Sequence, residues 1–235
     1  MTDLKLLRQN YLLVKKIVNR KQMNLKVLNT SILVFMMIVI SSCFLSSKKQ
    51  LPIYNPSDFY PELVDKSLQN LSENHKVADF KLINQNGKTI TQDDYNNKIY
   101  VADFFFTSCQ TICPIMTDNM AKIQKAYLYN DDIMFLSLSV TPDIDSIAVL
   151  REYANKKGVI DSKWNVTTGE KKHIYALARK SYFAVVEQGD GGLQDFIHTA
   201  NFILVDKQKR IRGIYNGTDD DEILRLINDI KTLTN

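Results

Sequence analysis

The sequence predicts an α/β domain in which helices cover a central β-sheet. Apolar runs of strand length alternate with stretches in which apolar residues recur at helical spacing. A pair of strands and a final helix close the pattern, as in an α/β sandwich. With 235 residues and 45% hydrophobic composition, the chain is long enough for one folded domain and an appendage.

The first predicted element of the domain is a β-hairpin with strands over 77–83 and 88–91. Asn86-Gly87 between them supplies the positive φ that a tight turn requires. The near-continuous apolar run 99–106 is typical of a strand that is covered on both faces. The remaining elements are, in order, a helix over 116–127, a strand over 133–140, helices over 147–154 and 174–181, strands over 201–205 and 211–215, and a helix over 223–233.

The charge of the chain is unevenly distributed. Residues 1–26 carry seven Lys or Arg side chains and one Asp, whereas the remainder carries 23 basic and 25 acidic side chains. The folded part therefore lacks the basic surface of a nucleic-acid-binding protein. Nine apolar residues over 32–40 follow the basic segment, and Ser41-Ser42-Cys43 comes next. This is the layout of an export signal.

Two kinds of membrane attachment fit this leader. Ile40-Ser41-Ser42-Cys43 resembles the lipobox of bacterial lipoproteins, in which the cysteine is lipidated and becomes the first residue. The alternative is an uncleaved anchor over 25–45, long enough to span ~30 Å of hydrocarbon. Either way, the domain lies on the non-cytoplasmic, periplasmic side of a bacterial cell membrane. We expect a cytoplasmic leader with a signal peptide or anchor (1–45), a tether and lead-in (46–75), and the domain (76–235).

Cys109 and Cys113 follow the strand 99–106 and, with Cys43, are the three cysteines of the chain. At the start of a helix, unsatisfied N–H groups and a partial positive charge favour ionisation of a thiol. Two thiolates can do redox chemistry or hold a soft metal ion. A structural disulfide is a third interpretation, although closing so short a loop constrains the unfolded chain little. Two thiolates alone suit linear Cu(I), whereas zinc needs four ligands.

The chain has three histidines that could add a ligand. His75 lies in the polar lead-in and His173 near the start of a lysine-rich helix, so we expect both to be solvated. His198 follows the flexible loop 189–192 and precedes the strand 201–205. The order of elements, with a cysteine motif after the first central strand, resembles thioredoxin, in which the loop before this later strand lies against the motif. We therefore expect His198 beside the two sulfurs.

Four segments together resemble the Sco/SenC family: 104–114 with Cys-x-x-x-Cys-Pro, 140–145, 166–169, and His198-Thr199 running into 202–206. Members of this family are membrane-tethered, thioredoxin-like proteins that bind copper and help to assemble cytochrome c oxidase. The resemblance covers 76–235 and implies a mixed β-sheet flanked by helices. It also implies one copper ion, Cu(I) or Cu(II), held by Cys109, Cys113 and His198.

The resemblance implies a metallochaperone that serves the CuA centre of the copper-accepting subunit of the oxidase. The alternative is a thiol-disulfide oxidoreductase that uses the redox-active pair Cys109 and Cys113 to reduce the acceptor's cysteines. A copper donor or a thiol reductant protein is the implied second partner. A peroxidase related to the peroxiredoxins is disfavoured, because Ala102 and Phe106 replace the proline and the hydroxyl residue before the reactive thiol.

The sequence also predicts the roles of two aspartates and two methionines near the cysteine motif. Asp103 stands where thioredoxins have a buried aspartate, and we interpret it either as a proton relay or as a strand residue on an exposed edge. Thr141 replaces the first acidic residue of the family's Asp-Pro-x-x-Asp pattern, and we expect Asp145 to cap the helix that follows. Met116 and Met120 lie at helical spacing, which is typical of core residues.

Overall fold

The computed structural model describes residues 15–16, 20, 50–59, 75–185, 187–192 and 194–234. Residues 1–49 and 50–235 form two separate compact units, and the second holds the predicted domain. Cys43 and almost all of the predicted signal or anchor segment lie outside the described residues. Among the residues that are described, no helix has both the length and the apolar composition to cross a bilayer.

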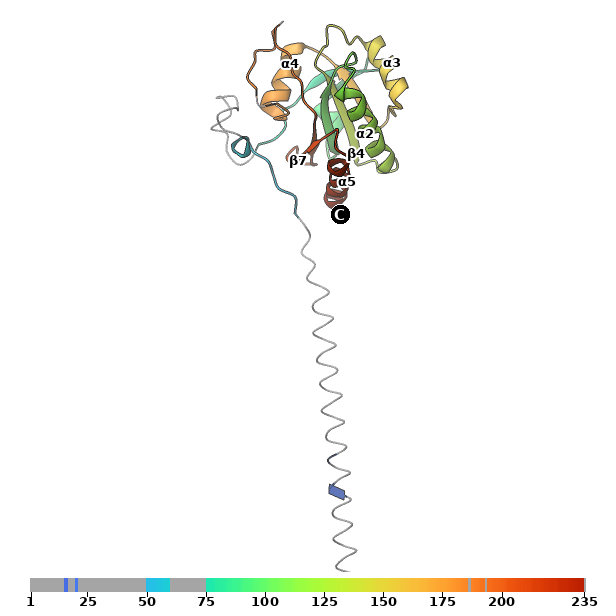
Figure 1. Ribbon diagram of the computed structural model, residues 1–235, viewed down its shortest axis with the longest axis vertical. Coiled ribbons are helices and arrows are strands. Elements are labelled where there is room, and N and C mark those ends of the chain that lie inside the picture. The colour runs from blue at the N-terminus through green and yellow to red at the C-terminus, as the bar shows by residue number, and fades with distance from the viewer. Residues whose placement is uncertain are drawn as a thin grey trace, which may run out of the picture. The chain divides into compact units, whose positions relative to one another are not determined.

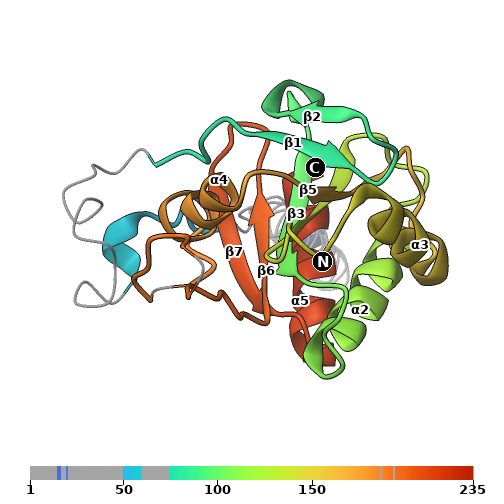
Figure 2. The same ribbon diagram turned by 90° about the horizontal axis from the view of Figure 1, so that it is seen from above.

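A mixed seven-stranded sheet forms the centre of the domain, with the strand order β2-β1-β5-β4-β3-β6-β7 (Figure 2). Strands β3, β4 and β5 are parallel, and the pairs on either side of them are antiparallel. The apolar runs that predicted β3 and β4 lie in the middle of the sheet, where both faces are covered. The strands are β1 (Lys81–Asn84), β2 (Thr89–Thr91), β3 (Ile99–Phe105), β4 (Ile133–Ser139), β5 (Trp164–Thr168), β6 (Asn201–Val205) and β7 (Ile211–Asn216).

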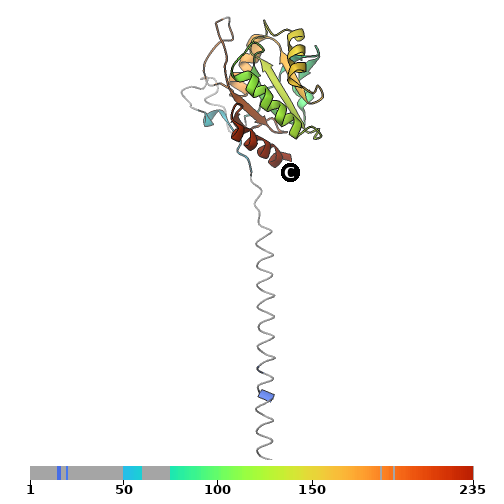
Figure 3. The same cartoon turned by 45° about the vertical axis from the view of Figure 1, so that its right-hand side comes forward.

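Helices cover both faces of this sheet, and an apolar cluster fills each interface. One face carries α2 (Ile112–Ala126), α3 (Ile147–Lys157) and α5 (Asp220–Thr234) (Figures 1 and 3). The other carries α4 (Lys171–Ala176), which continues into a π-helical turn over Leu177–Ser181. Met116 and Met120 are fully buried on α2, as predicted. This arrangement confirms the predicted α/β, thioredoxin-like fold.

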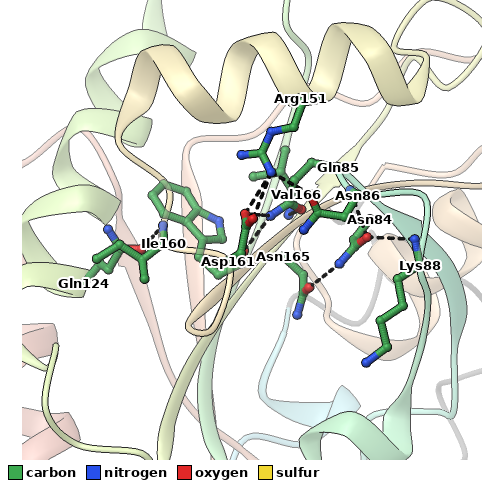
Figure 4. Close-up of polar contacts among 11 residues, drawn as sticks. Asn84, Gln85, Asn86, Lys88, Gln124, Arg151, Ile160, Asp161, Asn165 and Val166 are labelled. Atoms are coloured by element: carbon green, nitrogen blue, oxygen red, sulfur yellow. Dashed lines mark hydrogen bonds and ion pairs between the residues drawn. The ribbon is translucent and has the colours of Figure 1, made fainter.

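Strand β5 is not among the strands that the sequence pattern predicts, although all five of its residues are buried. β5 pairs with β1 over only two residue pairs. Beyond them, the Gln85 side chain continues the pairing, because it accepts from the Val166 N–H at 2.9 Å and donates to the Trp164 carbonyl at 3.0 Å (Figure 4). Asn84 donates to Asn165 at 2.9 Å. Polar side chains distant in sequence thus complete a strand whose own pattern is weak.

Residues 50–59, which the sequence predicts as part of a tether, pack against the edge of the sheet. Leu51 is buried, and the Tyr54 N–H donates to the Ile211 carbonyl of β7 at 2.9 Å. The Arg212 side chain donates to the carbonyls of Leu51 and Pro52 at 2.6 and 2.8 Å. The compact unit therefore begins at Gln50, before the expected boundary at residue 76.

Candidate metal and redox centre

The two predicted cysteines lie together at the end of the central strand β3. Cys109 is in the loop that follows β3, and Cys113 is in the first turn of α2. Both are buried free thiols, and their side chains lie close enough to affect each other's ionisation. The Cys109 N–H donates to the Phe106 carbonyl at 3.3 Å. Cys109 therefore precedes the helix, and the loop rather than helical spacing brings it to Cys113.

The Cys109 sulfur takes the place of a helix cap. Thr111 is the N-cap residue of α2, but its side chain makes no capping hydrogen bond. The backbone N–H groups of Thr111 and Cys113 point instead to the Cys109 sulfur, and the Thr111 hydroxyl lies 3.7 Å from it. Burial opposes ionisation of Cys109, but these hydrogen bonds and the one from the Cys113 thiol outweigh it and lower the pKa of Cys109 to about 7.

The pKa of Cys113 moves in the opposite direction. Burial raises it to about 12, and the hydrogen bond to Cys109 adds to this effect. Negative charge on Cys109 and Asp103 disfavours a second thiolate still further. Near pH 7 Cys109 is therefore partly ionised, whereas Cys113 keeps its proton. Of the two thiols, Cys109 is the more reactive as a nucleophile.

Asp103 is a buried carboxyl on the central strand, so its interpretation as a residue on an exposed edge is wrong. It accepts a hydrogen bond from the Ser137 hydroxyl, which in turn accepts one from the Trp164 indole at 2.9 Å. Burial raises the pKa of Asp103 to about 7, although the bond from Ser137 works against this. The proton-relay role stays a prediction.

Asp145 does not cap the following helix, and that prediction is wrong. Ser146 caps α3, because its side chain accepts from the Val149 N–H at 3.4 Å. The Asp145 side chain points inward and is fully buried. It accepts hydrogen bonds from the Thr107 N–H at 3.3 Å, from the Thr107 and Ser139 hydroxyls, and from the Thr141 hydroxyl at 3.0 Å. Asp145 thereby fixes the loop that leads to Cys109.

His198 does not lie in contact with the two sulfurs. Its side chain is exposed and lines an open cavity of about 360 Å³ together with Phe59, Phe183 and neighbouring residues. Its ring faces the Phe106 ring, with 6.5 Å between centroids. In the described part of the chain, no three His, Cys, Asp or Glu side chains are close enough together to hold one metal ion. The three-ligand site stays a prediction, which requires the His198 imidazole to come within bonding distance of the two sulfurs.

The other two histidines have structural contacts. The prediction that His75 is solvated is wrong: it is buried, its Nε2 lies 2.8 Å from the Ser181 carbonyl, and its ring packs on Phe183 with 4.5 Å between centroids. The sequence around His75 is polar, and only the folded chain brings Phe183 against it. His173 is half-buried and accepts from the Lys81 N–H at 3.3 Å.

The chain resembles known proteins in both its sequence and its fold. The SCO1/SenC family model matches residues 69–235. The SCO1 protein homolog of Bacillus subtilis is 33% identical over 161 residues, which cover 68% of this chain and 83% of that protein.

Solved structures agree with this result. A SCO1/SenC family lipoprotein from Bacillus anthracis is 34% identical, with a TM-score of 0.61 over 69% of this chain and 97% of that one. BsSco, described as a member of the Sco family of cytochrome c oxidase assembly proteins with a disulfide switch, is 32% identical, with a TM-score of 0.59 over 68% and 94%. Copper-bound ScoI of Bradyrhizobium japonicum, 21% identical with a TM-score of 0.51 over 66% and 98%, shares the fold. The chain described above belongs to the SCO1/SenC family.

Proposed function

We propose that this protein is a copper metallochaperone that assists assembly of the CuA centre of cytochrome c oxidase. The observation that carries the proposal is the thiol pair: two buried thiols at a helix N-terminus affect each other's ionisation, and the pKa of one of them is lowered to about 7. Soft thiolates are the ligands that Cu(I) prefers. Relatives in the same family are described as cytochrome c oxidase assembly proteins, which supports the oxidase as the destination.

One copper ion would bind through Cys109, Cys113 and His198. The two thiolates suffice for Cu(I), and the imidazole of His198 completes a site that also suits Cu(II). The ion then passes to the acceptor subunit by ligand exchange, in which each bond to Cys109 or Cys113 is replaced by one to an acceptor cysteine. A separate protein with similar soft ligands supplies the copper.

The proposed location is the non-cytoplasmic face of a bacterial membrane. Cys43 carries the lipid after cleavage of the signal, or the segment 25–45 remains as an anchor. The Bacillus anthracis relative is described as a lipoprotein, which supports the first form. Attachment at the membrane would bring the domain close to a membrane-bound oxidase.

A thiol-disulfide reductase is the second candidate, and the separation of the two thiol pKa values favours it. The Cys109 thiolate would attack a disulfide between the acceptor's cysteines and form a mixed disulfide, releasing one acceptor thiolate. The Cys113 thiol would lose its proton and displace the second acceptor thiolate. The acceptor gains two electrons, and Cys109 and Cys113 become a disulfide. A thiol reductant protein returns them to the reduced state.

Copper titration of the reduced full-length protein in detergent tests the proposal. Cys109→Ser and Cys113→Ser should each abolish binding of one copper ion, and His198→Ala should weaken Cu(II) binding sharply while retaining Cu(I). Reduction of a disulfide in an acceptor-derived peptide should be followed in parallel. If His198→Ala binds Cu(II) as the parent does and still reduces the peptide, the three-ligand site is excluded and the reductase becomes the leading function.

A further inference from the structure

Phe196 is a large apolar side chain that the fold leaves half exposed. It lies two residues before His198, in the connection between the π-helical turn and β6. Its exposed fraction is 50%, whereas Ile197 is only 2% exposed and His198 is exposed again. Such alternation is typical of an extended chain, in which every second side chain lies on the same side. Phe196 and His198 therefore share one side of this segment.

Both of these side chains face the ring of Phe106. The Phe196 and Phe106 rings pack edge to face, with 5.2 Å between centroids and an interplanar angle of 75°. The His198 ring lies farther away, with 6.5 Å between its centroid and that of Phe106. Edge-to-face aromatic pairs at the shorter separation attract each other. The contact of Phe196 is therefore the one that holds this side of the segment against Phe106.

Phe106 belongs to the loop that carries Cys109. It directly follows β3, and its carbonyl accepts from the Cys109 N–H at 3.3 Å. Its side chain packs against the apolar clusters on both faces of the sheet. The ring of Phe196 thus connects the histidine segment to a well-packed residue that is itself hydrogen-bonded to Cys109.

The chain is anchored directly before Phe196. The Arg179 guanidinium donates to both carboxylate oxygens of Asp195 at 2.7 Å, and these two side chains are only 6% and 10% exposed. Lys171 donates to the Asp195 carbonyl at 3.0 Å. A charged, two-pronged contact of this kind gives strong geometric control. The backbone therefore enters the segment 196–198 at a fixed point.

The chain is anchored again directly after His198. The Ala184 carbonyl accepts from the Thr199 hydroxyl at 2.9 Å and from the Asn201 side-chain amide at 3.0 Å. Between the two anchors, Ile197 packs into the core on one side of the chain, and Phe196 packs on Phe106 on the other. Loss of the Phe196 ring would free the side of the segment on which His198 lies.

We propose that Phe196 is a positioning residue for His198, because its ring packs on Phe106 and so holds the histidine segment beside the loop that carries Cys109. This inference rests on the proposed function, in which His198 is a copper ligand. Phe196 has no metal-binding atom, and it acts through the main chain two residues before His198. Its loss should therefore weaken the copper bond that His198 supplies and leave the thiols of Cys109 and Cys113 unchanged.

A half-exposed aromatic ring can also serve as a contact for a partner protein, because aromatic residues are enriched in such interfaces. A ring with that role alone would not affect copper binding by the isolated protein. The test is therefore made on the reduced full-length protein in detergent, without an acceptor.

The test compares the parent with four variants. Phe196→Ala removes the ring, Phe196→Tyr retains it, and His198→Ala removes the imidazole. Tyr129→Ala is the matched control, because it removes an aromatic ring that is 96% exposed and that follows the end of α2 away from Cys113. Substitutions at exposed positions change stability little, and thermal unfolding of each variant checks that all of them are folded.

The metal-free protein gives the first readout. The chain has three histidines, so the imidazole region of its proton NMR spectrum contains few signals, and the one that His198→Ala removes belongs to His198. Because the His198 ring faces Phe106, its signal depends on the relative position of the two rings. Phe196→Ala should shift this signal toward that of a free histidine. Phe196→Tyr and Tyr129→Ala should leave it in place.

The second readout is the release of Cu(II) from proteins loaded with one equivalent. Transfer to a chelator gives the dissociation rate, and nitrogen hyperfine splitting in the electron paramagnetic resonance spectrum reports the imidazole. Phe196→Ala should release Cu(II) about 2- to 10-fold faster than the parent, the effect expected for the loss of one aromatic pair. Phe196→Tyr and Tyr129→Ala should release it at the parental rate. Alkylation of Cys109 in the metal-free protein should be the same in all five proteins.

Three results would overturn the inference. A parental His198 signal and parental Cu(II) release in Phe196→Ala, with rapid release from His198→Ala, remove the positioning role and leave the proposed function intact. Equal acceleration by Tyr129→Ala or by Phe196→Tyr assigns the effect to something other than the ring contact. Parental release and spectrum in His198→Ala remove the histidine ligand itself, and the inference fails with the proposed site.

Discussion

The cysteine pair and His198 are held by the fold in opposite ways. Cys109 and Cys113 are buried where the central strand β3 meets α2, and Asp145 fixes the loop that leads to them. His198 is exposed on a segment whose described residues form no helix or strand, and the hydroxyl of the next residue, Thr199, donates to the Ala184 carbonyl at 2.9 Å. The cysteine half of the proposed site is thus formed without a metal ion, whereas the histidine half is not yet in place.

The two proposed functions therefore depend on different parts of the molecule. Disulfide exchange needs only the cysteine half, because the hydrogen bonds that ionise Cys109 are present in the metal-free chain. Cu(II) binding through all three proposed ligands would need both halves, because the imidazole would have to come within bonding distance of the sulfurs. Changes to the cysteine half should affect both activities, and changes to the histidine half should affect Cu(II) alone.

The largest expected effect is the difference in reactivity between the two thiols. In the reduced, metal-free protein at pH 7, iodoacetamide should modify Cys109 at least about 100-fold faster than Cys113, because only Cys109 is substantially ionised there. The rate at Cys109 should rise with pH and level off above its pKa of about 7. Peptide mass spectrometry over a time course measures both rates, and unfolding in urea should abolish the difference. Equal labelling in the folded state would contradict the asymmetry.

The second expected effect is the loss of stability when Asp145, which holds the loop before Cys109, is replaced. Asp145→Ala should lower the free energy of unfolding by about 3 kcal/mol, because several buried donors lose their acceptor together. Asp145→Asn should cost less, since an amide oxygen still accepts. Asp143→Ala is the matched control in the same loop, because Asp143 is exposed, and it should change stability by less than about 0.5 kcal/mol. Urea unfolding at pH 7 measures all three, and equal values for the two alanine variants would refute the role of Asp145.

Asp103 should make the stability of the domain depend on pH. Its pKa in the folded protein is raised to about 7, above the ordinary value near 3.8, so the folded state favours the protonated form. Its contribution is therefore fully present below about pH 4 and is lost as the pH rises through about 7. Asp103→Asn does not titrate and should match the parent at pH 4 but exceed it by about 4 kcal/mol at pH 8, because each pKa unit of difference is worth about 1.4 kcal/mol. A difference in stability that stays constant from pH 4 to 8 in urea unfolding would exclude the raised pKa.

The elements that the sequence predicted correctly are those with a local signal. The apolar runs of β3 and β4 and the Asn86-Gly87 turn depend on neighbouring residues, and so does the placement of Cys109 and Cys113 after β3. The proximity of the two thiols followed from their short separation in sequence.

The predictions that were missing or wrong concern residues whose contacts lie far away in the chain. β5 is completed by Gln85, about 80 residues earlier, and Asp145 is turned inward by Thr107, 38 residues earlier. His75 is buried by Phe183, which lies more than 100 residues later. Spacing cannot reveal contacts that exist only when the sheet is assembled.

The smallest expected effect is the most direct test of whether the two halves are independent. His198→Ala in the metal-free protein should change the free energy of unfolding by less than about 0.5 kcal/mol, because the side chain is exposed. It should also leave the rate and the pH profile of Cys109 alkylation unchanged, since the hydrogen bonds that lower the pKa of Cys109 come from Cys113 and Thr111. A rise in the alkylation midpoint by half a pH unit or more would show that the imidazole already acts on the sulfur without metal. In that case the two halves form one preassembled site, and copper binding does not require His198 to move.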